Sequence, residues 1–278
     1  MNEASKHLPV VEVRPERGLI NFDLKEIWQY RELIYYLTLR EIQIRYKQTA
    51  IGVIWAVLQP VITTIIFTII FSRLAQFESG NIPYPLFALS GLLIWLYVNN
   101  AVAISSQGLI NNPSLITKVY VPRVLLPTSV VLSTMVDLMI GLLILTGVLV
   151  YYQVPLSAKM LLAPVFILLA VILSESLGLL FSALNVRYRD VKHALPFLLQ
   201  IWMFLSPVFY TPEMLSEKWR TLLQFNPLYG VLQGFRASLL DIPFDWPAIG
   251  FSAVSIIILF IFSFTVFKRM EDTFADVI

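Results

Sequence analysis

Residues 247–267 read PAIGFSAVSIIILFIFSFTVF and contain no charged side chain. A helix needs about 20 mostly apolar residues to cross the hydrocarbon core of a bilayer, so this stretch is long enough for one span. Similar uncharged stretches occur at 48–72, 79–117, 138–158 and 193–212. Because backbone N–H and C=O groups find no water in lipid, we expect these stretches to be helical. The sequence therefore predicts an all-α integral membrane protein.

The composition favours the same class. Of the 278 residues, 58% are hydrophobic and only 14% are charged, whereas an average soluble domain carries about 25% charged residues. No cysteine is present, which excludes disulfides, thiolate metal sites and cysteine nucleophiles. The N-terminal region before the first apolar stretch is rich in charge and lacks the apolar segment of a signal peptide. We therefore expect membrane insertion to start at the first span.

We predict six spans, at 51–72, 84–106, 125–151, 160–184, 194–211 and 247–267. If the N-terminus is cytoplasmic, fifteen of the lysines and arginines fall on the cytoplasmic side and five fall outside. Short loops with an excess of these residues stay in the cytoplasm. Both termini are therefore expected to be cytoplasmic.

The predicted layout has four parts, and the first and last are cytoplasmic tails at 1–23 and 270–278. Residues 24–46 are expected to form an amphipathic helix, and residues 47–269 to form the six-span domain. The alternative for 24–46 is a soluble helix that packs on a partner. We favour a helix lying in the membrane interface, because it is basic, bears aromatics and directly precedes a span. The side chains predicted to share its apolar face are Leu24, Ile27, Trp28, Ile34, Tyr35 and Ile42.

The external segment 212–245 is too hydrophobic for a plain loop and too short and broken to cross the membrane twice. Its piece 228–240 reads LYGVLQGFRASLL, which indicates a short helix. We expect short re-entrant helices here, which are tolerated at membrane depth where protein or a water-filled cavity covers them.

Several catalytic and metal-binding motifs are absent from the sequence. It contains no G-x-x-x-x-G-K-[ST], no H-E-x-x-H and no G-x-S-x-G, which argues against a P-loop, a zinc protease site and a hydrolase nucleophile. The two histidines, His7 and His193, are far apart. We expect no catalytic residue and no metal site in this chain.

Two carboxylates lie inside the predicted spans, Asp137 and Glu175. Ionisable residues at membrane depth are costly and are candidates for a functional site. One interpretation is a substrate or proton path. The other is a hydrogen-bonded anchor between helices, with Ser133, Ser174 or Ser176 as the partner, and we favour this structural role.

Aromatic side chains are abundant, with 19 Phe, 12 Tyr and 6 Trp. Aromatic belts at the two membrane interfaces account for many of them. Stacking against sugar rings is a more specific interpretation, and composition alone does not choose between the two.

Five short segments carry a resemblance to a known family. They are 45–55 (RYKQTAIGVIW) followed by LQP at 58–60, 112–123 (NPSLITKVYVPR), 185–191 (NVRYRDV), 206–210 (SPVFY) and 226–228 (NPL). In this order they resemble the ABC-2 type permeases that export O-antigen, capsule and teichoic acid polysaccharides, and the resemblance covers about residues 24–269. It implies the ABC-2 exporter fold in a bacterial inner membrane.

The resemblance also implies the partners. A permease of this kind works as a homodimer with two copies of a separate ATPase subunit, which binds the ATP and Mg²⁺. No cofactor is then expected in this chain, and no nucleic acid is expected as a partner. The residues implied to couple the permease to the ATPase are Asn112, Pro113, Lys118, Tyr120, Pro122, Arg123, Arg187, Tyr188, Arg189 and Asp190.

The implied substrate is a glycan on a polyprenyl-pyrophosphate lipid. We expect its pyrophosphate to enter at Arg40, Arg45 and Lys47, since arginine suits bidentate phosphate binding. The aromatics expected to line a glycan channel are Trp55, Phe67, Trp202, Phe204, Phe209 and Tyr210. The alternatives are an ABC-2 permease for drugs or lipids, a membrane-embedded glycan enzyme and a proton-coupled carrier.

Overall fold

The computed structural model describes residues 28–47, 52–74, 82–118 and 121–274, and every regular element within them is a helix. The predicted tail at 1–23 and the last residues of the predicted tail at 270–278 lie outside these ranges. Five helices in the described part are long and apolar enough to cross a membrane. They are α3 (Gly52–Phe67) with a π-helical extension (Thr68–Leu74), α4 (Tyr84–Ser105), α6 (Leu125–Tyr151), α7 (Ala163–Arg187) after a 3₁₀ turn (Ala158–Leu162), and α11 (Trp246–Glu271).

Local sequence signals set the limits of the last span, α11. The Asp245 side chain accepts a hydrogen bond from the Ala248 N–H, and Pro247 occupies the first turn, where its missing N–H costs nothing. Lys268 and Arg269 lie in the last turn, where cations interact favourably with the helix dipole. The helix predicted at 247–267 is thus confirmed, with four more residues at its end.

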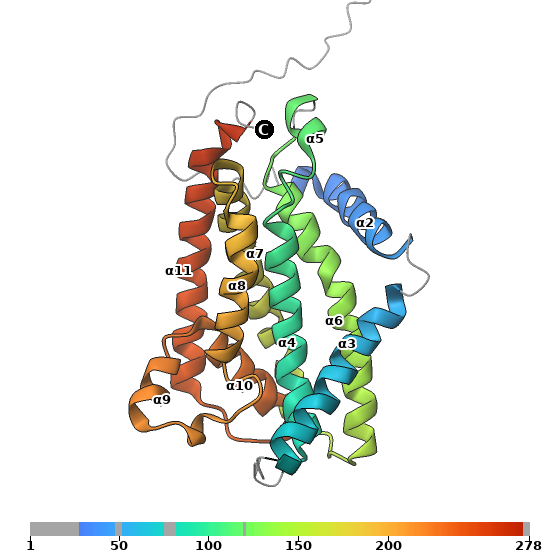
Figure 1. Cartoon of the computed structure of the whole chain (residues 1–278), viewed down its shortest axis with the longest axis vertical. Coiled ribbons are helices and arrows are strands. Elements are labelled where there is room, and N and C mark those ends of the chain that lie inside the picture. The colour runs from blue at the N-terminus through green and yellow to red at the C-terminus, as the bar shows by residue number, and fades with distance from the viewer. Residues whose placement is uncertain (1–27, 48–51, 75–81, 119–120, 275–278) are drawn as a thin grey trace, which may run out of the picture.

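The central helix of the bundle is α4, which packs against α3, α6, α7, α8 and α10 (Figure 1). Most of its side chains are buried. Small residues let its neighbours approach closely: a Cβ added to Gly178 of α7 would overlap the Ser105 hydroxyl of α4. Small residues at the contacts are the usual means of helix association in membranes.

The helix α8 (Val191–Phe204) stands in place of the fifth predicted span, 194–211. It has 14 residues and is therefore about 21 Å long at 1.5 Å per residue. Residues 205–210 form turns and bends. The sequence explains this end, because Pro207 disfavours the helical conformation of the residue before it.

The bundle has two ends, which we name the α5 end and the α9 end (Figure 1). The helix α5 (Pro113–Lys118) and the C-terminal end of α11 lie at the first. The helices α9 (Glu217–Leu223) and α10 (Pro227–Leu240) lie toward the second. The helix predicted within 228–240 is confirmed as α10, which begins at Pro227 with the Asn226 side chain accepting from the Leu228 N–H.

Two contacts fix the direction of α7 between these ends. The Asn185 amide near its C-terminus donates to the Ser106 carbonyl after α4 (3.0 Å). Lys159, before its N-terminus, forms an ion pair with Asp241 after α10 (2.7 Å). The helix α7 therefore starts at the α9 end and finishes at the α5 end.

The helix α2 (Arg31–Lys47) lies beside α6 at the α5 end (Figure 1). The side chains that pack inward are Tyr30, Leu33, Ile34 and Leu37. Of the predicted apolar face, Ile34 packs inward, Trp28 and Tyr35 are exposed, and Leu24 and Ile27 lie outside the described residues. The exposed side chains leave the predicted location in the membrane interface as a prediction.

Candidate functional site: a pocket beside α2

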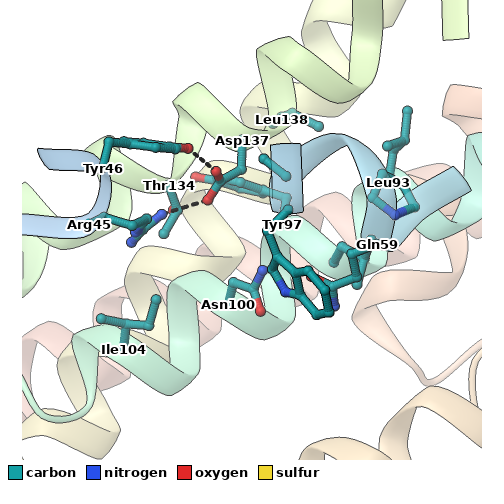
Figure 2. Close-up of a pocket in the computed structure, with 14 residues that line it drawn as sticks. Arg45, Tyr46, Gln59, Leu93, Tyr97, Asn100, Ile104, Thr134, Asp137 and Leu138 are labelled. Carbon is teal, nitrogen blue, oxygen red and sulfur yellow. Dashed lines mark hydrogen bonds and ion pairs between the residues drawn. The ribbon is translucent and has the colours of Figure 1, made fainter. Parts of the chain in front are cut away.

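A pocket of about 550 Å³ lies where the C-terminal end of α2 meets α3, α4 and α6 (Figure 2). This volume falls within the range of small-molecule sites. Its lining residues are Arg45, Tyr46, Trp55, Ala56, Gln59, Pro60, Leu93, Leu96, Tyr97, Asn100, Ile104, Thr134, Asp137 and Leu138.

Two side chains of α2 converge on the Asp137 carboxylate of α6 (Figure 2). The Arg45 guanidinium forms an ion pair with it, with 2.5 Å between Nη1 and Oδ2, and the Tyr46 hydroxyl donates to its other oxygen. Both partners of the ion pair are about three-quarters buried. Burial, together with the hydrogen bond to Asp137, raises the pKa of the Tyr46 phenol above its ordinary value of 10. The phenol therefore remains a donor throughout the physiological pH range.

The serine partners expected for Asp137 are wrong. The Ser133 hydroxyl donates to the Val130 carbonyl within its own helix (2.8 Å), and Asp137 instead pairs with a cation from α2. An arginine 92 positions away in the chain supplies this cation. The carboxylate thus links α6 to α2 through an ion pair.

The rest of the pocket combines amides and hydroxyls with apolar walls. Gln59 and Asn100 contribute carboxamides, and Tyr97 contributes a phenol. Trp55 is 61% exposed, so the pocket opens to the outside of the chain on that side. Such a pocket suits an amphiphile with an anionic or hydroxyl-rich head.

The three cations expected at a pyrophosphate entry are not gathered at one point. Arg45 lines the pocket, while the Arg40 guanidinium bonds to Glu41 (2.8 Å) and to the Asn112 carboxamide (2.5 Å). Lys47 is exposed at the last position of α2. Arg40 thus ties α2 to the first predicted coupling loop, and the pyrophosphate role of the three residues stays a prediction.

The predicted channel aromatics fall into two groups. Phe67 of α3 stacks on Phe209 with ring centroids 3.5 Å apart, and Trp202 meets Trp95 edge-on while its indole N–H donates to Asn226. These contacts hold the segment after α8 against the helical bundle. Trp55 and Phe204 are each 61% exposed. Tyr210 lies between the groups, half-buried, and its hydroxyl donates to the Phe204 carbonyl (3.2 Å).

The predicted coupling residues also divide. Asn112 bonds to Arg40, and the Arg123 guanidinium donates to the Glu271 carbonyl at the end of α11. Pro122 is buried and Pro113 is exposed. Tyr120 and the side chain of Lys118 lie outside what the structure describes. Four neighbouring side chains are exposed at the α5 end: Arg187, Tyr188, Arg189 and Asp190.

The second intramembrane carboxylate, Glu175 of α7, accepts a hydrogen bond from the Thr128 hydroxyl of α6 (2.6 Å). The serines beside it, Ser174 and Ser176, donate to carbonyls of their own helix. Glu175 is outside the pocket, so the two acids do not form one path through the described residues.

Sequence reasoning missed Arg236 of α10, which is fully buried. Its guanidinium donates to the carbonyls of Pro207 (2.6 Å) and Val208 (2.5 Å) and lies 3.8 Å from the centre of the Phe87 ring. It therefore fixes the turn after α8 against α10 and α4. The signal was available in the sequence, because Arg236 is the one charge within LYGVLQGFRASLL.

No group of three His, Asp or Glu side chains with metal-binding geometry occurs among the residues that the structure describes. The polar groups that line the pocket are one guanidinium, one carboxylate, two amides and several hydroxyls, all of which can take part in binding.

Comparison with known proteins gives concordant results. The family model described as "ABC-2 type transporter" matches residues 32–240. The O-antigen export system permease protein RfbA of Myxococcus xanthus is 30% identical over 91% of this chain and 98% of its own length. RfbA of Klebsiella pneumoniae is 23% identical over 89% of this chain and 95% of its own length. The polysialic acid transport protein KpsM of Escherichia coli is 26% identical over 73% of this chain and 80% of its own length.

The family model spans all five of the motif segments and most of the helical bundle, from α2 to the end of α10. The pocket, the buried Arg236 and both intramembrane acids all lie inside the matched region. This chain belongs to the ABC-2 type transporter family.

Proposed function

We propose that this chain is the membrane subunit of an ATP-driven exporter that moves a lipid-linked polysaccharide across the bacterial inner membrane. The observation that carries the proposal is the agreement among relatives aligned over most of the chain. Proteins from two organisms are named for O-antigen export and one from a third for polysialic acid transport. Their substrates differ in sugar composition but are all polysaccharides.

The topology supports six crossings with both termini in the cytoplasm. The helix α7 ends at the α5 end and α11 starts at the α9 end, so the chain between them must traverse the bundle (Figure 1). The short α8 and residues 205–211 make this traverse, since Phe209 accepts a hydrogen bond from the Tyr84 hydroxyl at the start of α4. The excess of lysine and arginine at the α5 end supports a cytoplasmic location for that end.

We place transport and ATP hydrolysis on separate subunits because this sequence lacks an ATP-binding motif. It contains no P-loop, so ATP with its Mg²⁺ would bind to a separate ATPase subunit. In our proposal two copies of each subunit assemble. The surface for the ATPase is the exposed group Arg187, Tyr188, Arg189 and Asp190 together with α5, because exposed charges can form charge-assisted bonds across an interface.

The proposed substrate path uses the exposed aromatics. Trp55 and Phe204 present open ring faces, on which the C–H faces of sugars can stack without sequence preference. Phe67, Trp202 and Phe209 would instead hold the walls in place, since their rings contact other rings of the same chain. The short helices α9 and α10 would shape the exit in the outer leaflet.

Reconstitution tests the proposal. This chain would be purified with the ATPase encoded beside it, and ATP hydrolysis measured in lipid with and without a polyprenyl-pyrophosphate-linked glycan. We expect a stable complex whose hydrolysis rate rises with the glycan. Stimulation by drugs or plain phospholipid, with none by the glycan, would instead assign the chain to another branch of the family.

A further inference from the structure

The inference concerns Asp137 and rests on the proposed function. The Asp137 position is 12 residues after the first residue of α6, which is about 18 Å along the helix at 1.5 Å per residue. A carboxylate at that depth in a span is costly unless it is paired. It is paired with Arg45, and both groups face a pocket with an exposed tryptophan on its open side.

We infer that Asp137 is an internal counter-ion that selects which lipid phosphates Arg45 accepts in this pocket. When a lipid headgroup enters, the Arg45 guanidinium passes from the carboxylate to a phosphate oxygen, and Asp137 retains the hydrogen bond from the Tyr46 hydroxyl. No covalent bond changes. The exchange replaces one guanidinium–anion pair by another. Its free energy therefore depends on the additional charge and hydrogen bonds that the headgroup contributes.

A headgroup with one phosphate gains little from this exchange. It acquires the guanidinium that Asp137 loses, and the two negative groups then face each other within a partly buried site, where repulsion is strong. Removing one partner of a buried pair leaves a charge without compensation, which is the main cost. Ordinary anionic phospholipids, which surround the protein in large excess, are therefore excluded.

A headgroup with two linked phosphates can offset that cost. Its second phosphate reaches donors that the first does not use, and the pocket provides them in the Gln59 and Asn100 carboxamides and the Tyr97 phenol. It also binds the guanidinium with a larger negative charge. The apolar walls, including Leu93, Leu96 and Leu138, accommodate the first units of the lipid tail. The pocket thus favours a pyrophosphate lipid by rejecting monophosphates, which is specificity built on a repulsive element.

The test measures selectivity instead of activity alone. The chain would be assembled with its ATPase in nanodiscs, and binding measured for a polyprenyl pyrophosphate, a polyprenyl monophosphate, phosphatidylglycerol and inorganic pyrophosphate. In the native protein we expect the polyprenyl pyrophosphate to bind most tightly, and inorganic pyrophosphate, which lacks the tail, to bind weakly. D137N should strengthen binding of the monophosphate and of phosphatidylglycerol about tenfold, which corresponds to 1.4 kcal/mol, with a smaller change for the pyrophosphate lipid.

Matched variants separate selectivity from stability. E175Q alters the other intramembrane acid, which lies outside the pocket, and should leave the relative affinities unchanged. The double variant R45Q/D137N keeps side chains of similar shape without charge and should bind all three lipids weakly and without preference. If D137N and the double variant keep the native ratios between the three affinities, Asp137 is only an anchor and the inference is wrong.

That failure would be distinct from failure of the proposed function. Unchanged selectivity in a protein that still hydrolyses ATP in response to a lipid-linked glycan would overturn the inference alone. Absence of any response to the glycan by the native complex would overturn the proposed function, and with it the inference.

Discussion

Two arginines in the described helices show how single residues keep charge inside an apolar bundle. Arg45 is neutralised by a carboxylate from another helix, whereas Arg236 is held by two backbone carbonyls and an aromatic face. The first arrangement contains two opposite charges that can exchange partners. The second contains no acid, so its guanidinium has nothing to exchange, and we interpret it as a fixed structural clamp.

The Arg45–Asp137 pair should show strong coupling in a double-mutant cycle. R45A leaves the carboxylate without its cation and should lower the free energy of unfolding by about 2 kcal/mol, below the 3–5 kcal/mol of a fully buried pair because both groups keep some exposure. Adding D137N should recover most of that loss. Thermal unfolding in detergent measures both. Equal melting temperatures for R45A and the double variant would contradict the pairing.

The clamp at Arg236 predicts that lysine is a poor substitute. A lysine ammonium lacks the planar fork that reaches the Pro207 and Val208 carbonyls together. R236K should cost about 2 kcal/mol, the loss of one buried hydrogen bond to a charged group. The exposed Arg220 provides the control, since R220K should leave the melting temperature unchanged. A native melting temperature for R236K would show that the clamp is dispensable.

At the scale of elements, the long helices could be predicted from the sequence to within a few residues, and the short ones less well. Length and hydropathy decide whether a segment crosses lipid, which is why the predictions for 84–106 and 125–151 agree with α4 and α6. Within the span predicted at 194–211, the helix α8 ends at Phe204, shortly before Pro207. A count of apolar residues does not detect this local signal. The contact between α2 and α6 could not be predicted from local sequence, because the two helices are distant in the chain.

The candidate site was less accessible to prediction than the helices. Arg45, Trp55 and Asp137 were all singled out from the sequence, but as members of three different sets. Only the fold brings them together, because they belong to α2, α3 and α6. Hydropathy predicts where the helices lie in the sequence, but it carries no information on which charged side chains of different helices contact each other.

Close contact between α10 and α7 makes a further prediction. A Cβ added to Gly234 of α10 would overlap the Phe166 ring of α7, whereas one added to Gly147 of α6 would meet nothing within 4 Å. G234A should therefore cost about 1–3 kcal/mol through overpacking. G147A should be neutral or slightly stabilising, as alanine favours helix. Melting temperatures of the two variants check this, and a destabilised G147A with a native-like G234A would contradict the packing.

The exposed group at the α5 end predicts a loss of coupling without a loss of fold. Arg187 and Arg189 are exposed, so R187A/R189A should leave the melting temperature unchanged while reducing ATPase co-purification at least severalfold. The matched change K218A removes an exposed cation at the α9 end and should have no effect on assembly. Normal ATPase assembly in R187A/R189A would place the ATPase surface elsewhere.

Across the whole molecule, side-chain contacts connect the elements at the α5 end. Arg40 joins α2 to the first predicted coupling loop, and Arg123 joins that loop to the end of α11. The same helix α2 contributes Arg45 and Tyr46 to the pocket, where both bond to Asp137. In the proposed exporter, a headgroup that draws Arg45 away from Asp137 would act on the same helix whose Arg40 contacts the predicted coupling loop, and so on the surface proposed for the ATPase.

ATP-dependent movement of a glycan across a membrane is the activity that polysaccharide export requires, and it can be measured in vesicles. Inverted inner-membrane vesicles containing this chain and its ATPase would be loaded on their outer face with a radiolabelled lipid-linked glycan, and protection of the label from an added glycosidase would be followed. If the chain exports a polysaccharide, protection of the label should accumulate with ATP and should require both subunits. Label that stays accessible with ATP, in vesicles whose ATPase is active and bound to this chain, would contradict polysaccharide export.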